Sequence, residues 1–502
     1  MATPDDDKPI TPRKIVFVHP DLGIGGAERL VIDAVVGLQS LGHKVTILTS
    51  HRDKNHCFEP ARDGTLDVRV RGDAVFPTTI AGGLSIVLAM LRQLALVFSV
   101  ALSTNELKTL DPDVIFVDQL SICIPFLRWL HPKAKVLFYG HFPDRLLANQ
   151  GEGLTKYAKA VYRAPFDGIE GWSTACADDI VVNSKFTRAV FKGTFDGLRK
   201  RELKVIYPCV DTSETQSKNS APLWPDKKVI LSINRFEGKK NLSLAIHAYA
   251  GLSLQERSKA KLILAGGFDP ATPRTQPRTT DSKTSPTPSN SLTPPSAATT
   301  LSPRTSPPTT SLMVYTPPNE HFGIVPLEAM LAGVPVLATD SGGPLETIYD
   351  GRTGFLRRPE SVELWTDVMR KTLIPSSESA LHKMGQKGKE RVLAEFSQTK
   401  MVDALDREIQ ALCRSTGPRP TMIPDWLYVA FILSGMSVVV CVLMLGLLVW
   451  AVNHDKENRL NSNGSLTGTV VEVVTSTTSM AGWEELWESA KASKRARGRD
   501  EL

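Results

Sequence analysis

The alternation of short apolar runs with helical patterns constrains this chain more than any other feature. Residues 14–18, KIVFV, form an apolar run that ends at a glycine-rich turn, and residues 27–42 then carry apolar side chains at helical spacing. A second apolar run follows at residues 44–50. Strand, turn, helix and strand form a βαβ unit, which predicts a parallel sheet.

The same pattern continues in two blocks. Further strand candidates of the first block are residues 113–117, 135–140, 179–184 and 203–208. After a polar linker the second block offers residues 228–234, 261–267, 311–317 and 334–340. We therefore expect an α/β chain with two Rossmann-like domains, residues 14–215 and 222–412, that face a cleft.

Composition excludes several classes of protein. The 42% apolar and 22% charged residues are ordinary for globular domains, and much of the net charge of +6 lies in the last dozen residues, so no nucleic-acid groove is expected. The six cysteines form no CxxC pair, which argues against a zinc site or a disulfide framework. The polar N-terminus, residues 1–13, lacks the apolar core of a signal peptide, so we expect the chain to start in the cytosol.

Two long apolar stretches raise the question of a membrane. Residues 427–452 contain no charge and would form a helix of about 39 Å, longer than a bilayer core of about 30 Å, which predicts one transmembrane helix. Residues 80–103 contain Arg92 and Gln93. If residues 80–103 spanned a membrane, the strands of one sheet would lie on its two sides. We therefore expect a helix packed in the domain or lying on the membrane surface.

Two segments carry a different composition. Of the 42 residues 269–310, 29 are Pro, Thr or Ser, which cannot build a core and predicts disorder inside the second domain. The polar tail, residues 453–502, contains a sequon at Asn463 and ends in RDEL, and both fit the luminal side of the endoplasmic reticulum.

Residues 315–333 hold two glutamates, Glu320 and Glu328, eight positions apart. Pro326 suits the first turn of a helix and Gly333 its end, so we expect a helix over 325–332. An anion would bind the backbone N–H groups at its start, around Gly323, Ile324 and Val325. The glutamates would then face sugar hydroxyls of a nucleotide-sugar, although the spacing alone also fits two ordinary glutamates on a solvated helix.

These residues carry a resemblance to a known family. The stretch NEHFGIVPLEAMLAGVPVLATDSGGPLETI resembles the E-x7-E signature of retaining glycosyltransferases of the GT-B fold. Together with SINRFEGKKNLSLAI and YGHFPD, it is similar to the mannosyltransferases of dolichol-linked oligosaccharide assembly. The resemblance covers roughly residues 14–268 and 312–412.

The resemblance implies a substrate pair and a place in the cell. GDP-mannose would be the donor, and Man1–2GlcNAc2-diphosphodolichol would receive mannose in α-1,3 and then α-1,6 linkage, with retention and without a metal or other cofactor. The catalytic domains would lie on the cytosolic face of the endoplasmic reticulum membrane. Other transferases of the pathway are further expected partners.

The resemblance also implies roles for single residues. Glu328 would hold the ribose, and Glu320 and His141 the transferred mannose. Arg235 and Lys240 would neutralise the diphosphate as its charge develops in the transition state. Without the family, the two cations also fit a solvated basic turn, and a histidine at a strand end is usually structural.

Two glycine turns are further candidates. Gly25 and Gly26 would let donor phosphate or acceptor approach the backbone, although GIGGAE also fits a plain tight turn. The SGGP turn, residues 341–344, would offer backbone N–H groups before a helix that starts at Pro344.

Residues 269–310 are the main departure from the family. They stand where the family has a strand and two helices of the nucleotide-base wall. Either an intron has been read as protein, or the chain is a variant with impaired donor binding. The rivals to an active mannosyltransferase are therefore a catalytically impaired or non-catalytic membrane scaffold and a transferase that uses another nucleotide-sugar.

Overall fold

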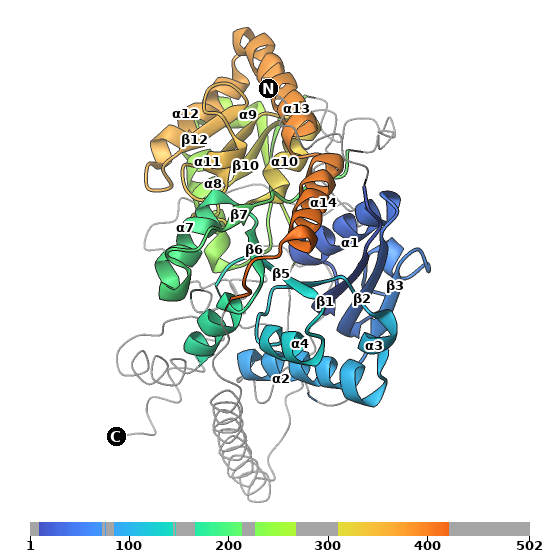
Figure 1. Ribbon diagram of the computed structural model, residues 1–502. Helices are drawn as coiled ribbons and strands as arrows, with labels where there is room; N and C mark the ends of the chain where they lie inside the picture. The colour runs from blue at the N-terminus through green and yellow to red at the C-terminus, as the bar shows by residue number, and fades with distance from the viewer. Residues whose placement is uncertain are drawn as a thin grey trace, which may run out of the picture. The chain divides into compact units, whose positions relative to one another are not determined.

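A seven-stranded parallel sheet forms the first half of the protein. The computed structural model describes residues 10–72, 76, 85–143, 146, 166–212, 226–267 and 310–420. The strands of this sheet are β1 Lys14–Leu22, β2 Lys44–Arg52, β3 Asp67–Val70, β4 Val114–Asp118, β5 Lys135–Gly140, β6 Asp179–Val182 and β7 Lys204–Val205. Their order is β3-β2-β1-β4-β5-β6-β7 (Figure 1). The order reverses between β1 and β4, which is where doubly wound sheets bind ligands.

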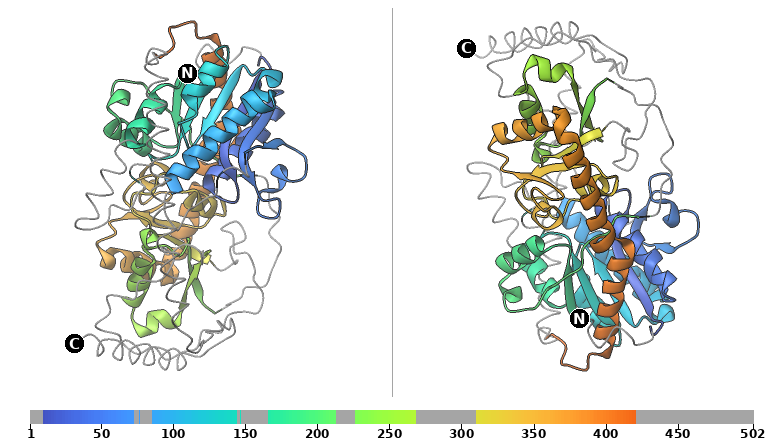
Figure 2. Two further views of the ribbon diagram at one scale, coloured as in Figure 1. Left: turned by 90° about the horizontal axis from the view of Figure 1, so that it is seen from below. Right: turned by 90° about the horizontal axis from the view of Figure 1, so that it is seen from above.

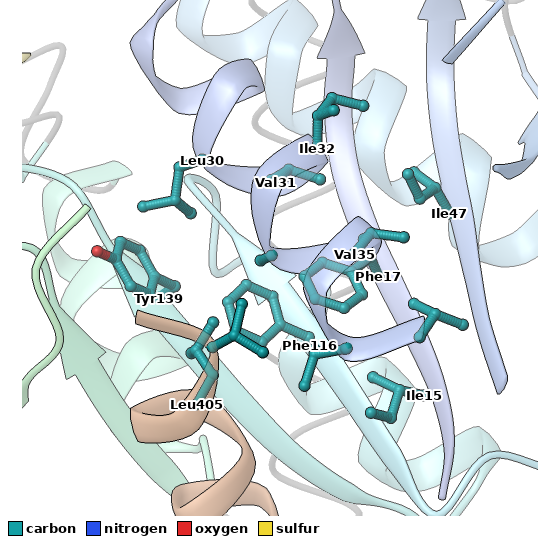
Figure 3. Packing of buried hydrophobic residues seen from close by; sticks show 14 of the residues in the cluster. Ile15, Phe17, Leu30, Val31, Ile32, Val35, Ile47, Phe116, Tyr139 and Leu405 are labelled. Carbon is teal, nitrogen blue, oxygen red and sulfur yellow. The ribbon is translucent and has the colours of Figure 1, made fainter. Parts of the chain in front are cut away.

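Helices connect these parallel strands. They are α1 Gly26–Ser40, α2 Ser85–Phe98, α3 Glu106–Leu110, α4 Ile124–Leu130 and α7 Lys185–Thr194, with the short helical turns η1 Glu59–Ala61, η2 Ser99–Ser103 and η3 Asp196–Leu198. The apolar spacing of α1 turns Leu30, Val31 and Val35 toward the sheet (Figure 3). Under them the rings of Phe17 and Phe116 stack with centroids 4.3 Å apart. Burial of such side chains is the main stabilising contribution of the first half.

A five-stranded parallel sheet forms the second half, in the order β12-β11-β10-β8-β9. Its strands are β8 Lys228–Ile233, β9 Ala260–Ala265, β10 Thr310–Tyr315, β11 Val336–Thr339 and β12 Gly354–Arg357. Its helical elements are η4 Gly238–Lys240, α8 Leu242–Ala250, α9 Leu254–Ser258, α10 Ile324–Leu331, α11 Pro344–Thr347, α12 Val362–Leu373, η7 Pro375–Ser377, α13 Glu378–Glu395 and α14 Gln398–Arg414. All ten strand candidates are confirmed to within a few residues, whereas the short strands β3 and β12 were not predicted.

Helix α14 follows the second sheet in the chain but packs against the first. Its Met401, Leu405 and Ile409 are buried in the same core cluster as α1 and β1, and Leu405 lies near Phe116 and Tyr139 (Figure 3). Helix α14, drawn in the deepest orange, lies beside α1 in the views of Figures 1 and 2. A buried polar contact joins it to His43, the residue before β2, whose Nε2 lies 3.1 Å from Asp406 Oδ1. The described residues therefore belong to one compact unit.

The apolar stretch at residues 80–103 forms α2 and η2 from Ser85 onward. Among the described helices, the segment Ile86–Ser103 alone is long and apolar enough to cross a membrane, and 44% of it is buried inside the protein. Two polar residues near its middle have protein partners: Arg92 Nη1 donates to Asp21 Oδ2 at 3.0 Å, and Gln93 Nε2 donates to the Leu120 carbonyl at 2.8 Å. The expected helix is thus confirmed from Ser85 onward and packs in the domain, and its contact with a membrane surface stays a prediction.

Several predictions lie outside the described residues. These are the transmembrane helix at 427–452, the tail at 453–502 with its sequon and terminal RDEL, and the disorder of 269–310. One residue of the last segment is described: Thr310 begins β10 and therefore belongs to the sheet.

Candidate functional site

The loop that carries Glu320 connects β10 to α10. The predicted helix at 325–332 is confirmed as Ile324–Leu331, with Pro326 in its first turn. Gly323 caps the helix with φ of +86°, and Gly333 ends it with φ of +74°. Both are left-handed conformations that glycine adopts without strain. The backbone N–H groups of the first turn, including Ile324 and Val325, are those that an α-helix leaves without intrahelical partners.

Lys240 and Glu320 form an ion pair although 80 positions separate them. Lys240 Nζ lies 2.6 Å from Glu320 Oε2, and the two side chains are 14% and 19% exposed. Lys240 ends η4, which follows β8, and Glu320 follows β10, the neighbouring strand. Thr316 Oγ1 donates to the Lys240 carbonyl at 2.7 Å and holds the two loops together. Two of the predicted site residues are thus in direct contact.

The charge of Glu320 is set by opposing effects. Burial by itself raises the pKa of Glu320, but the Lys240 ammonium and a hydrogen bond from Tyr315 overcome burial and leave the pKa below its ordinary value. Burial and the Glu320 carboxylate raise the pKa of Tyr315 well above its ordinary value, so its hydroxyl stays protonated and donates. Glu320 is therefore an anion that already accepts from two donors.

The other predicted donor-site residues flank this pair. Glu328 lies in the second turn of α10 and is half-buried. Arg235 follows β8, its side chain is 72% exposed, and its Nη1 lies 3.3 Å from Glu237 Oε1. A guanidinium that is mostly exposed remains available to a diphosphate.

Gly25 and Gly26 lie where β1 passes into α1. Gly25 is the N-cap of α1 in extended backbone, with φ of −167°, so its conformation does not require glycine. At Gly26 a Cβ would lie 3.7 Å from Ile324 Cδ1, an ordinary van der Waals distance, so space does not require glycine there either. The start of α1 thus lies close to the start of α10.

His141 follows directly after β5, at the carboxyl end of the sheet. Its Nε2 lies 2.7 Å from Asp118 Oδ1, and its side chain is 20% exposed. The next residue, Phe142, stacks on His321 with ring centroids 3.8 Å apart. Ser184 Oγ also donates to the His321 carbonyl at 2.7 Å. The segment that follows β5 and carries His141 is thereby in contact with the loop that carries Glu320.

His321 itself is a neutral side chain. Burial lowers its pKa to about 4, an effect that the nearby Glu320 carboxylate only partly opposes. A neutral ring stacks on Phe142 without bringing an uncompensated charge into the protein.

The SGGP turn packs against the loop that carries Glu320. The prediction that its backbone N–H groups are open to a ligand is wrong for Gly343, because its N–H donates to the Glu320 carbonyl at 2.7 Å. A Cβ on Gly342 would lie 2.4 Å from that same carbonyl, and one on Gly343 would lie 2.2 Å from the Phe322 carbonyl. Only glycines fit this contact, and α11 starts at Pro344 as predicted.

Sequence reasoning missed two buried residues behind His141: Asp118, which contacts His141, and His19, which contacts Asp118. Asp118 is the last residue of β4, which lies beside β5, and His19 lies in the C-terminal half of β1, which lies beside β4. Their positions at the ends of apolar runs were the available signal. No short motif links the three residues, because they are spaced by about 100 and 23 positions.

Comparison with known proteins gives consistent matches. Residues 24–214 match Glycosyltransferase Family 4, and residues 308–391 match Glycosyl transferases group 1. Alpha-1,3/1,6-mannosyltransferase alg-2 of Neurospora crassa is 45% identical over 453 residues, which cover 84% of this chain and 95% of the relative. Alpha-1,3/1,6-mannosyltransferase alg2 of Schizosaccharomyces pombe is 42% identical over 439 residues, which cover 82% of this chain and 84% of the relative.

A solved structure supports the same fold. The crystal structure of Anabaena Alr3699/HepE in complex with UDP and glucose aligns with a TM-score of 0.52 at 17% identity. The alignment covers 80% of this chain and all of the neighbour. The two parallel sheets are therefore the two Rossmann-like domains of a GT-B glycosyltransferase. With more than 40% identity to these relatives over most of its length, the chain belongs to the family of the alpha-1,3/1,6-mannosyltransferases.

Proposed function

We propose that this protein transfers mannose from GDP-mannose to Man1–2GlcNAc2-diphosphodolichol, first in α-1,3 and then in α-1,6 linkage, with retention. Family membership supports the reaction, and the names of the relatives describe both linkages. The observation that carries the site assignment is the Lys240–Glu320 pair, which places a cation and a carboxylate beside the start of α10.

The chemistry of this arrangement fits a nucleotide-sugar with a diphosphate. Lys240 and Arg235 would stabilise the negative charge that develops on the leaving diphosphate, and the open N–H groups of α10 would bind its oxygens. When donor binds, Lys240 would turn from Glu320 to the phosphate. The freed carboxylate of Glu320 would then accept hydrogen bonds from mannose hydroxyls, while Glu328 would hold the ribose.

We further propose that no metal takes part and that the protein works at the endoplasmic reticulum membrane. Two preorganised cations can replace a divalent ion at a diphosphate. In the described part of the chain, no cluster of three or more His, Cys, Asp or Glu residues could hold a metal. The catalytic domains would face the cytosol, where GDP-mannose and the growing lipid-linked acceptor meet.

The test uses the purified full-length protein with labelled GDP-mannose and a lipid-diphosphate-linked acceptor in detergent. We expect transfer by the wild type, with Glu328→Gln raising the KM for GDP-mannose at least tenfold because a ribose contact is lost. Glu363→Gln is the matched control, since Glu363 is exposed on α12. Transfer should persist in excess EDTA.

The rival functions give different results. A transferase for another nucleotide-sugar would be protected from thermal unfolding by that donor rather than by GDP-mannose. A non-catalytic scaffold would complement a deficient cell equally well after Glu320→Gln and Glu328→Gln. Either result would overturn the proposal.

A further inference from the structure

Three polar side chains meet at the carboxyl ends of three neighbouring strands in the first half. His19 lies on β1, Asp118 ends β4, and His141 follows β5. Strand β4 pairs with β1 on one side and with β5 on the other. This is the point where the strand order reverses, so the cluster occupies the expected ligand-binding edge of the sheet.

Asp118 contacts both histidines through different oxygens. Its Oδ2 lies 2.8 Å from His19 Nδ1, and its Oδ1 lies 2.7 Å from His141 Nε2. The side chains of His19 and Asp118 are fully buried, whereas that of His141 is 20% exposed. Of the three, only His141 therefore has surface with which to meet a ligand.

The partners of His19 determine its protonation. Its Nδ1 faces the Asp118 carboxylate, and its Nε2 lies 3.1 Å from the Asp21 carbonyl oxygen. An ionised carboxylate and a carbonyl can only accept, so both ring nitrogens must carry a proton. His19 is thus an imidazolium buried against the Asp118 carboxylate. Consistently, the pKa of Asp118 is lowered to about 2 by the two histidines despite burial, and that of His19 is raised by Asp118 despite burial.

Asp118 also fixes one proton of His141. Because the carboxylate oxygen Oδ1 of Asp118 can only accept, His141 Nε2 carries a proton and donates it. His19 already places a positive charge against Asp118, so this carboxylate needs no second cation. No partner for His141 Nδ1 occurs among the described residues, and in a ring protonated on Nε2 alone this nitrogen is a hydrogen-bond acceptor.

We propose that Asp118, balanced by His19, is a positioning residue that holds His141 in the tautomer whose Nδ1 accepts a hydrogen bond from a hydroxyl of the transferred sugar. The inference rests on the proposed function, because it takes the hydroxyl to be that of the donor mannose. Asp118 acts only through His141: it fixes both the angle of the ring and the nitrogen that is free of a proton.

The kinetic test is a double-mutant cycle in the full-length protein. We expect Asp118→Asn to lower kcat at least tenfold, because the amide cannot accept from both histidines, with KM for GDP-mannose within threefold of the wild type. In a His141→Ala background the same change should alter kcat less than twofold. Fully additive losses would overturn the inference, since Asp118 would then act independently of His141.

A matched control separates positioning from simple stability. Asp406 is also a buried carboxylate beside a histidine, with Oδ1 3.1 Å from His43 Nε2, but it lies on α14 away from the strand ends. Asp406→Asn should lower the thermal midpoint and leave kcat within twofold. If it lowers kcat as much as Asp118→Asn, the effect of Asp118 is structural.

A second measurement does not require Asp118→Asn to fold. ¹⁵N–¹H correlation spectra of the wild-type protein with labelled histidine report which ring nitrogens carry protons, and the spectrum of His141→Ala assigns the His141 signals. We expect His141 protonated on Nε2 alone and His19 on both nitrogens. A His141 proton on Nδ1, or a singly protonated His19, would overturn the inference. Wild type without mannose transfer would instead overturn the proposed function, while the spectra still decide the tautomer.

Discussion

The two sheets of this protein begin alike and end differently. Each opens with a buried strand, a turn, a helix and a second parallel strand. In the first half the second strand, β2, lies between β3 and β1, and its Ile47 is fully buried. In the second half the corresponding strand, β9, pairs with β8 alone among the described residues, and its Ile263 is only partly buried. An apolar strand pattern thus predicts a strand, but its burial depends on the next strand in the sheet.

The halves also differ in how they hold charge. The first half encloses His19 and Asp118 completely, with each oxygen and nitrogen of the pair assigned a partner. The second half leaves the side chains of Lys240 and Glu320 partly exposed, although Glu320 also accepts from Tyr315. A buried pair is costly to break and therefore fixes geometry, whereas a partly exposed pair can exchange its partner for a ligand.

One matched pair of substitutions tests the difference in burial between the two sheets. Ile47→Ala should cost about 4 kcal/mol of unfolding free energy, because it leaves a cavity in a fully enclosed core. Ile263→Ala, at the corresponding strand, should cost about 1.5 kcal/mol because that side chain is already partly in contact with solvent. Urea unfolding of both variants measures the two values.

An equal cost would contradict the difference between the sheets. It would mean that further chain covers the edge of β9 in the folded protein. A loss near 4 kcal/mol at both positions would therefore locate a covering segment, and deletion of residues 270–308 would then test whether that segment lies within the chain itself.

The charge difference predicts the next largest effect. Lys240→Met should lower mannose transfer about 100-fold, or about 3 kcal/mol in the barrier, since the diphosphate loses a preorganised cation. Lys239→Met is the control, because its side chain is 65% exposed and its Nζ lies 3.7 Å from Glu237. Single-turnover rates with saturating GDP-mannose make the comparison. Equal rates for the two variants would remove Lys240 from the site.

His19 in the first half and His321 in the second should make stability depend on pH in opposite directions. The pKa of His19 is raised, so its contribution to stability is present at acid pH and is lost as pH rises through its folded-state pKa. The pKa of His321 is lowered to about 4, so the unfolded chain takes up a proton first as pH falls below its ordinary value of 6.5. The stability that depends on His321 is therefore lost between pH 6.5 and 4.

The variant His321→Phe tests the expected loss of stability at acid pH. Phenylalanine preserves the stack on Phe142 and cannot titrate. Between pH 7.5 and pH 5 the unfolding free energy of the variant should therefore fall by about 2 kcal/mol less than that of the wild type. Chemical unfolding at the two pH values measures this difference. His131→Phe in the first half is the comparison: burial also lowers the pKa of His131 and Asp111 opposes the effect, so a difference of the same sign is expected. Identical pH profiles for wild type and His321→Phe would show that the pKa of His321 is the same in the folded and the unfolded chain, so that burial does not lower it.

Much of the candidate site could be predicted from short stretches of sequence. Pro326 and Gly333 bound α10 because their backbone preferences are local, and Gly323 adopts the conformation that its place before the helix needs. The roles of Glu320, Glu328, Arg235 and Lys240 came from the family motif. The SGGP turn shows the limit of this reasoning: its glycines suggested an open anion site, yet the Gly343 N–H is taken by the Glu320 carbonyl.

The sequence alone determined the parallel strands, the helix starts and the family, because each is encoded in residues close together in the chain. Tertiary structure decided which distant residues meet. It brought α14 onto the first sheet, paired Lys240 with Glu320, and placed Asp118 between His19 and His141. The physical reason is that the order of strands in a sheet, not their order in the chain, sets which strand ends are neighbours. A parallel sheet can therefore assemble a site from residues that no local pattern connects.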